Sequence, residues 1–163
     1  MSAEPESVVI RPGRRQDAKA IQALYESSVP KTTAGLAYEE SDWRLYVGRP
    51  HVRLIVAEGR LDRGVVGMLL GYDLVNWGYC DVLVVSEKAR KLGIGSRLLA
   101  AFECSGEDHW VASELAVDQE DEGLRAFVKK HGYAEAGTAE WRVRDLSTSG
   151  EAERRRRKFR GGV

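Results

Sequence analysis

The sequence has little cysteine and no long apolar run, and both absences narrow the class of protein. The two cysteines among its 163 residues, Cys80 and Cys104, form no motif, so we interpret them as buried free thiols. No window approaches the roughly 18 apolar residues that a membrane-spanning helix needs. The polar and acidic start, MSAEPESVV, is unlike a signal or transit peptide. We therefore expect a cytoplasmic protein that does not use a membrane.

Histidine is scarce as well. The three histidines, His51, His109 and His131, are scattered, and no pair has the spacing of metal ligands. We interpret each of them as structural or exposed and expect no metal site.

The formal net charge is zero, but the charges are unevenly distributed. Residues 147–163, STSGEAERRRRKFRGGV, carry six Arg or Lys and two Glu, a net +4 that leaves −4 for residues 1–146. A mildly acidic body argues against a nucleic-acid-binding core and suits a site for amines. We predict one domain at 1–146 and a disordered basic tail at 147–163. Contact between the tail and nucleic acid is a minor alternative.

The order of the apolar patterns predicts a single α/β domain. Strand-like patterning recurs at residues 8–12, 51–58, 64–74, 78–85, 110–117 and 139–146. Helical spacing is found in four places, which are the segments after Asp17, around Trp43, after Gly93, and from Asp118 to Gly132. We expect Asp17 and Asp118 to cap the first and last of these helices. The consecutive middle strands predict an antiparallel meander, and the strand–helix–strand at 80–117 predicts one parallel crossover.

The stretch SEKARKLGIGSRLLAAFE (86–103) places R-x-x-G-x-G between a strand end and a helix start. The first turn of a helix has free backbone N–H groups and the positive end of the helix dipole. Gly93 and Gly95 lack a Cβ, so an anion can approach these groups, and Arg90 and Lys91 add positive charge. The stretch therefore indicates a phosphate-binding turn. The P-loop and the dinucleotide fingerprint do not fit, because G-K-[ST] and a third glycine are missing.

The wider pattern V-x-x-x-x-R-x-x-G-I-G-x-x-L-L, from Val85 to Leu99, resembles the acyl-CoA-binding motif of the GNAT superfamily of N-acetyltransferases. The segments IRPGRRQDAKAIQALY and DQEDEGLRAFVKKHGY resemble that family's first strand and helix and its N-x-x-A-x-x-F-Y-x-x-x-G-F segment. The resemblance spans residues 8–146. It implies a mixed sheet of six to seven mostly antiparallel strands, with a parallel, splayed central pair and about four helices.

The resemblance also implies acetyl-CoA as the cosubstrate. In that family the N–H groups of the glycine turn hold the pyrophosphate, and the preceding strand binds the pantetheine arm through its backbone. One strand amide would polarise the thioester carbonyl. The cofactor-binding residues implied here are Leu83, Val84, Val85, Arg90, Lys91, Leu92, Gly93, Ile94, Gly95 and Ser96.

One departure from the family pattern affects the chemistry. Phe127 matches, but Val128 stands where the family usually has a tyrosine that protonates the departing thiolate. Valine cannot donate a proton, and Tyr133 aligns with a structural aromatic residue. Solvent can take over this step, since a thiolate with a pKa near 8.5 needs less help than an alkoxide.

A base must also accept a proton from the amine. Period-two alternation predicts that Tyr79, Asp81, Leu83 and Val85 share one face of their strand. Asp81 and Tyr79 are therefore catalytic candidates, and Glu114 on the neighbouring strand is another. The structural alternatives are a strand-end acid that bonds nearby backbone or an arginine for Asp81, and a solvent-facing or salt-bridged residue for Glu114.

The function predicted from the sequence is acetyl transfer from acetyl-CoA to a primary amine by direct attack through a ternary complex. The alternative is a catalytically silent module of the same fold that binds acyl-CoA or a protein partner, which Val128 favours. The expected acceptor is an amine on a small molecule or on a protein or peptide, because fold does not fix the substrate. A homodimer is one of the assemblies that the sequence leaves open.

Overall fold

The computed structural model describes residues 8–28, 38–106, 108–117 and 121–137. Its strands are β1 (Val8–Pro12), β2 (Val52–Gly59), β3 (Val65–Asp73), β4 (Trp77–Val85) and β5 (Ala112–Leu115). Its helices are α1 (Ala18–Ser28), α2 (Glu40–Tyr46), α3 (Ile94–Cys104) and α4 (Glu122–Lys130). All of these elements belong to one compact unit that ends at Ala134. The strand expected at 139–146 and the basic tail at 147–163 lie outside the described residues.

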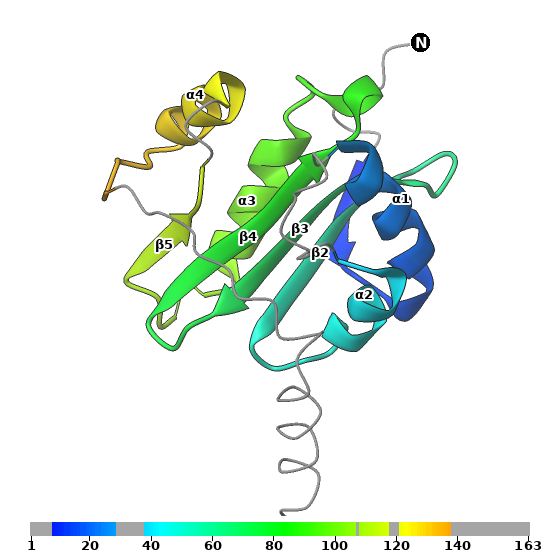
Figure 1. Cartoon of the computed structure of the whole chain (residues 1–163), viewed down its shortest axis with the longest axis horizontal. Helices are drawn as coiled ribbons and strands as arrows, with labels where there is room; N and C mark the ends of the chain where they lie inside the picture. Colours follow the sequence, from blue (N-terminus) through cyan, green and yellow to red (C-terminus); the bar gives the residue numbers. More distant parts are fainter. Residues whose placement is uncertain (1–7, 29–37, 107, 118–120, 138–163) are drawn as a thin grey trace, which may run out of the picture. The chain divides into compact units, whose positions relative to one another are not determined.

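The five strands form one sheet in the order β1-β2-β3-β4-β5 (Figure 1). The first three junctions are antiparallel and the last, β4–β5, is parallel. The antiparallel meander and the single parallel crossover through α3 are thus confirmed. The mixed α/β class with four helices is confirmed too, with five of the expected six to seven strands inside the described part of the chain.

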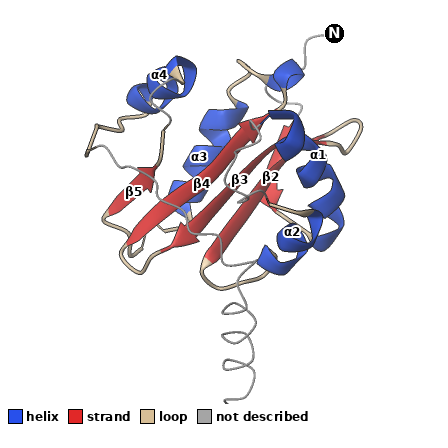
Figure 2. Cartoon of the chain, viewed as in Figure 1, coloured by secondary structure: helices blue, strands red, loops and turns tan. Residues whose placement is uncertain are grey.

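Helices pack on both faces of the sheet (Figure 2). Helix α3 covers one face, where the apolar stripe expected from the sequence is buried in full: Ile94, Leu98, Leu99 and Phe102. Helices α1 and α2 cover part of the other face, where Ile21 and Trp43 pack against Met68 and Leu70 of β3. The helical spacing in the sequence therefore identified the faces that form the core.

Close packing of α3 depends on a glycine in β3. A Cβ built on Gly71 would come within 2.3 Å of the ring of Phe102, which is closer than real Cβ atoms approach. Glycine at this position lets the helix lie against the sheet without displacing the ring.

Three local expectations were wrong. Asp17 does not cap α1 by accepting from a later N–H, because its carboxylate accepts from the N–H of Arg14 at 2.7 Å and from Arg11. Helix α4 begins after Asp121, whose side chain accepts from the N–H of Leu124, and not after Asp118. Of the two cysteines only Cys80 is buried, since Cys104 lies on the exposed side of the last turn of α3.

Candidate active site

The glycine turn has the backbone shape of an anion-binding loop. Gly93 is the N-cap of α3 and has φ +75°, and Lys91 also has a left-handed φ of +63°. A Cβ on Gly93 would meet no atom within 4 Å, so the space beside the helix end is open. Such alternation of backbone conformations turns successive N–H groups toward one concavity.

The N–H groups at this helix end precede the first intrahelical bond. That bond runs from the N–H of Arg97 to the carbonyl of Gly93, 3.1 Å. The N–H groups of Ile94, Gly95 and Ser96 come before it in the chain and have no carbonyl one turn back in the helix. The predicted phosphate-binding residues of the turn are thereby brought together at one helix terminus.

Two cations of the motif lie at the turn in different ways. The Nε of Arg90 donates to the carbonyl of Val85 at 3.2 Å, which ties the turn to the end of β4. Lys91 is exposed and adds its positive charge directly at the turn. Both contribute to a field that favours an anion at the N-terminus of α3.

Helix α4 backs this turn. A Cβ on Gly95 would lie 3.5 Å from the ring of Phe127, so the aromatic residue that matched the family pattern packs on the turn. Val128, the next residue, is buried and carries no group that could donate a proton. The hydroxyl of Tyr133 lies 2.7 Å from Glu103 and 2.8 Å from Ser113, which supports the structural role expected for it.

Strands β4 and β5 pair over only part of their length. The parallel ladder runs from Trp77–Ala112 to Cys80–Leu115, and residues 81–85 of β4 continue beyond it. The N–H of Ser86 donates to the carbonyl of Val66 at 2.9 Å, so by alternation along an antiparallel ladder Val84 also bonds toward β3.

The same alternation directs the backbone groups of Leu83 and Val85 toward the side of β5. There the β4–β5 pairing has already ended. Val84 differs from them, since its side chain is buried on the face of α1 and α2 and its backbone is directed to β3. Of the three predicted strand residues, Leu83 and Val85 are thus the two that present backbone groups at the open edge.

A β-bulge at Asp81 changes the face that later residues of β4 present. In the β3–β4 register Leu70 faces Val82 and Gly71 faces Cys80, so Asp81 has no opposite residue of its own. The prediction that Tyr79, Asp81, Leu83 and Val85 share one face is therefore wrong. Leu83 and Val85 pack on the side of α3, while Asp81 contacts Tyr38 on the opposite side.

Tyr79 and Asp81 do share the face of α1 and α2, as the sequence predicted. Tyr79 lies opposite Tyr72 on β3, which packs in the core of that face, and is paired with Glu114 on β5. Since paired residues point to the same side, Glu114 belongs to this face as well, and its side chain is exposed. The structure thus brings all three catalytic candidates to one region, beside the point where β4 and β5 stop pairing.

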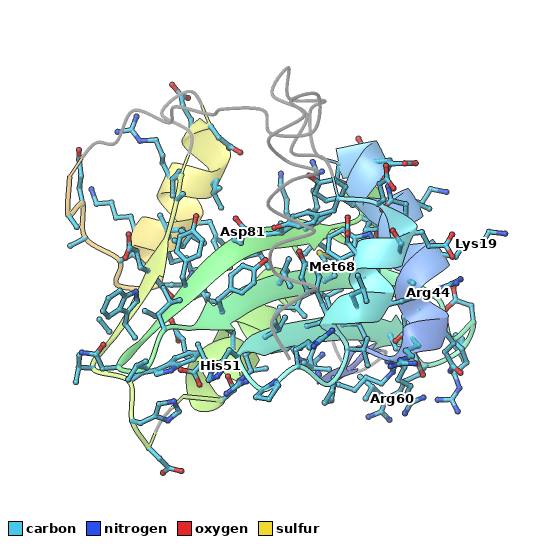
Figure 3. All side chains as sticks on the ribbon, turned by 60° about the horizontal axis from the view of Figure 1, so that its bottom comes forward. Lys19, Arg44, His51, Arg60, Met68 and Asp81 are labelled. Carbon is cyan, nitrogen blue, oxygen red and sulfur yellow. The ribbon has the colours of Figure 1, made fainter. Side chains whose placement is uncertain are left out.

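The sequence reasoning missed two tyrosines here. Tyr38 donates its hydroxyl to the carboxylate of Asp81, and its oxygen lies 3.2 Å from the hydroxyl of Tyr72. Figure 3 shows Asp81 on this face of the sheet, with the cations Lys19 and Arg44 on the outer side of α1 and α2. No periodic pattern marks Tyr38, because it precedes α2 and reaches Asp81 across 43 positions of sequence.

Burial and nearby carboxylates keep Tyr38 and Tyr79 neutral. Burial, followed by the hydrogen bonds to Asp81 and Tyr72, raises the pKa of Tyr38 far above its ordinary 10. Burial also raises the pKa of Tyr79, with further contributions from Asp81 and Glu114. Neither hydroxyl is therefore a base near neutral pH, which leaves the two carboxylates for that role.

Metal ligation and membrane insertion find no support in the part of the chain that the structure describes. No group of three His, Cys, Asp or Glu residues there is arranged to hold a metal ion. None of the described helices has both the length and the apolar character to cross a bilayer.

The model of the acetyltransferase (GNAT) family matches residues 19–133, which is most of the chain. The chain belongs to the GNAT acetyltransferase family. This confirms the resemblance drawn from the Val85–Leu99 motif, and it makes the glycine turn and the β4–β5 opening features of a GNAT fold.

Solved structures of GNAT acetyltransferases share this fold. Ribosomal-protein-alanine N-acetyltransferase from Brucella melitensis biovar Abortus 2308 has a TM-score of 0.65 at 20% identity, covering 85% of this chain and 99% of its own. The aminoglycoside acetyltransferase meta-AAC0020 from an uncultured soil metagenomic sample, solved with sisomicin, has a TM-score of 0.70 at 20% identity, covering 85% and 97%.

A third structure, AAC(6')-Iy with the bisubstrate analogue CoA-S-monomethyl-acetylneamine, has a TM-score of 0.70 at 14% identity, covering 85% of this chain and 99% of that one. At these identities the likeness concerns the fold. A comparison with curated protein sequences finds no match.

Proposed function

We infer that this GNAT protein is an N-acetyltransferase that moves an acetyl group from acetyl-CoA to a primary amine by direct attack in a ternary complex. One observation carries the inference: the pairing of β4 and β5 ends at Cys80–Leu115. This end point lies between the glycine turn and the sheet face that carries Asp81 and Glu114. Helix α3, at whose N-terminus we place the anion, packs on one face of the sheet, and Asp81 and Glu114 lie on the other.

The residues of the turn fit coenzyme A. The open space at Gly93 and the N–H groups of Ile94 to Ser96 suit a pyrophosphate, which Arg90 and Lys91 would help to neutralise. The edge backbone of Leu83 and Val85 would bond the amide groups of the pantetheine arm. When bound, acetyl-CoA supplies an activated acetyl group on a thiolate leaving group with a pKa near 8.5.

The residues of the opposite face fit an amine acceptor. A carboxylate, Asp81 or Glu114, would accept the proton that the attacking amine loses. Tyr79 lies between them and, since its pKa is raised, would position the acceptor as a neutral hydroxyl. A strand N–H at the opening would stabilise the charge that develops on the carbonyl oxygen. Val128 leaves protonation of the thiolate to solvent.

Direct attack agrees with the state of the cysteines. Cys80 is 1% exposed, and burial raises the pKa of its thiol to about 12. A nucleophilic cysteine needs an accessible thiolate, which this site does not provide. Cys104 lies at the far end of α3 from the glycine turn.

Turnover of acetyl-CoA by the purified full chain, read by release of free thiol with a panel of primary amines, tests the proposal. We expect at least one amine to accelerate thiol release above the rate without amine, and about 1 mM CoA to raise the melting temperature. Thiol release no faster than the blank with every amine, combined with a CoA-induced shift, would favour the silent acyl-CoA-binding module. If neither amine-dependent thiol release nor a shift in melting temperature with CoA is observed, acetyl-CoA is not the cosubstrate.

A further inference from the structure

Tyrosine is concentrated at one place in this chain. Five of its six tyrosines lie on the sheet face that α1 and α2 border, and these are Tyr25, Tyr38, Tyr46, Tyr72 and Tyr79. Together with Asp81 they form what we call the tyrosine cluster. The sixth, Tyr133, contacts Glu103 and Ser113 instead.

We propose that the tyrosine cluster binds a second, non-reacting ammonium group of the acceptor, so that the preferred substrate is a diamine or larger polycation. In this arrangement Asp81 anchors the non-reacting ammonium, Tyr38 positions Asp81, and Glu114 serves the nitrogen that is acetylated. The inference rests on the acetyl transfer proposed above and names the substrate class of the same site.

The charges on this face favour a cation. Strands β3, β4 and β5 contain no lysine or arginine, and their acidic residues are Asp73, Asp81 and Glu114. Asp73 is occupied by Arg53 at 2.9 Å and by the indole of Trp110 at 3.0 Å. Asp81 and Glu114 are both exposed, and the hydrogen bond that the structure gives Asp81 comes from a neutral phenol.

The rings around Asp81 suit an ammonium group. The Tyr38 ring lies with its centroid 5.8 Å from that of Tyr46, and Tyr46 lies 6.4 Å from Tyr72. Aromatic faces attract cations within about 6 Å of the ring centroid, and desolvated sites strengthen the attraction. Burial raises the pKa of Tyr25, Tyr38, Tyr46 and Tyr79, and the charge of Asp81 adds to the rise at each of them, so Asp81 lies near all four hydroxyls.

The cluster is held in place from behind. Trp43 is fully buried, with its ring centroid 4.8 Å from that of Tyr38. Its indole N–H donates to the side-chain oxygen of Gln22 at 2.5 Å, and the amide nitrogen of Gln22 donates to the backbone carbonyl of Tyr38 at 3.0 Å. Tyr38 is therefore fixed at both its backbone and its ring, and this packing holds its hydroxyl in contact with Asp81.

Holding a charged nitrogen and activating a neutral one are different tasks for a carboxylate. An amine attacks only when it is neutral, whereas a carboxylate beside an ammonium group raises that group's pKa and keeps it protonated. An exposed carboxylate that is oriented by Tyr38 is thus suited to hold an ammonium group in its charged state. The reacting nitrogen is left to Glu114, which lies on β5 and is paired with Tyr79 of β4.

A matched pair of acceptors tests the proposal with the full chain. The diamine 1,4-diaminobutane and the amino alcohol 4-aminobutan-1-ol have equal chain length and differ in the second charge. With saturating acetyl-CoA we expect a KM at least about tenfold lower for the diamine, the ratio that roughly 1.4 kcal/mol produces. Equal KM values for the two acceptors would overturn the proposal.

Substitutions at Asp81 and Tyr38 test whether these two residues cause the lower KM for the diamine. Asp81→Asn and Tyr38→Phe should raise the ratio of the diamine KM to the amino-alcohol KM about tenfold and about threefold. Asp62→Asn in the β2–β3 turn and Tyr133→Phe are the matched controls, and neither should change the ratio of the diamine KM to the amino-alcohol KM. If Asp81→Asn instead lowered kcat for both acceptors at unchanged KM, Asp81 would be the base and the proposal would be wrong.

A binding measurement separates this proposal from acetyl transfer itself. Calorimetric titration of 1,4-diaminobutane into the protein with CoA, where no acetyl group is present, needs no turnover. Binding of the diamine that is at least about tenfold tighter than that of the amino alcohol, and that is lost in Asp81→Asn, would support the site even in a chain that transfers no acetyl group. Absence of this preference would overturn it even if acetyl transfer were found.

Discussion

His131 Nε2 lies 2.8 Å from the hydroxyl of Ser96, so the end of α4 is joined to the first turn of α3. The other ring nitrogen of His131 lies 2.8 Å from the carbonyl of Phe127, and the two rings lie 4.3 Å apart. Phe127 in turn packs over Gly95. Helix α4 therefore supports the glycine turn from the side, and this turn is where we place the pyrophosphate.

Ser96→Ala should weaken the contact between α4 and α3 without changing the space at the glycine turn. The variant leaves the imidazole of His131 without its hydroxyl partner, which costs about 1 kcal/mol and lowers the melting temperature by about 2–4 °C. Thermal unfolding followed by circular dichroism measures it. Ser41→Ala, at an exposed position of α2, is the control, and a loss no greater than in that control would contradict the role given to the hydroxyl.

Gly93→Glu should abolish stabilisation by CoA. The substitution puts a negative charge where the pyrophosphate is expected, and a side chain at φ +75° adds strain of about 1–2 kcal/mol. Gly93→Ala carries the strain without the charge and should keep a reduced shift in melting temperature. Gly48→Glu is the matched control, since Gly48 has φ +76° and no atom within 4 Å of its Cβ position. An unchanged CoA shift in Gly93→Glu would exclude the turn as the site.

The parts of the fold that depend on local pattern could be predicted from the sequence. The α3 stripe was readable because Ile94, Leu98 and Phe102 recur at helical spacing, and all three are buried as expected. The parallel crossover followed from the order strand, helix, strand. The glycine turn was readable because it combines small residues, cations and a helix start in seven positions.

The parts that depend on register and on distant contacts could not be predicted. The run from Asp81 to Val85, DVLVV, is apolar after its first residue, so nothing in it marks the bulge that reverses which side chains face α3. The contact between Tyr38 and Asp81 joins residues 43 positions apart and leaves no periodic trace. The sequence did identify Asp81 as an acid in a strand, but its partner is set by tertiary packing alone.

A buried ion network joins β1, β2 and the turn before α1. The guanidinium of Arg11 bonds Asp17 at 2.7 Å and Glu58 at 2.6 Å, and all three side chains are at most 11% exposed. Burial opposes ionisation of Asp17, but hydrogen bonds from Arg11 and from the N–H of Arg14 outweigh it and lower its pKa below 3.8. The hydrogen bond from Arg11 likewise lowers the pKa of Glu58 below 4.5.

Arg11→Ala should therefore destabilise the fold strongly at neutral pH. Removing the guanidinium leaves Asp17 charged and buried without its partner, which costs about 3–5 kcal/mol in free energy of unfolding. Urea titration measures the loss, and Arg15→Ala, at an exposed neighbouring position, should change stability by less than about 0.5 kcal/mol. A loss in Arg11→Ala as small as in this control would contradict the network.

The same network predicts a pH dependence with a defined sign. Because both carboxyl pKa values are lower in the folded state, their stabilisation is complete above pH 4.5 and is lost as the pH falls through the lowered values. The difference in free energy of unfolding between wild type and Arg11→Ala should thus be largest near pH 7 and shrink below pH 4.5. A difference that stayed constant down to about pH 3 would contradict this linkage.

The two thiols should react very differently, and the contrast tests direct attack. Cys104 is exposed, whereas Cys80 is buried with a pKa raised to about 12 by burial, so a disulfide reagent should titrate one thiol in the native protein and two in denaturant.

Cys80→Ala should keep kcat/KM within about twofold, because the amine attacks the thioester without a cysteine intermediate. It should still lower the melting temperature, since the thiol fills core space beside α3. A loss of turnover in Cys80→Ala that exceeds about a hundredfold, with the fold intact by circular dichroism, would require a covalent route in place of direct attack.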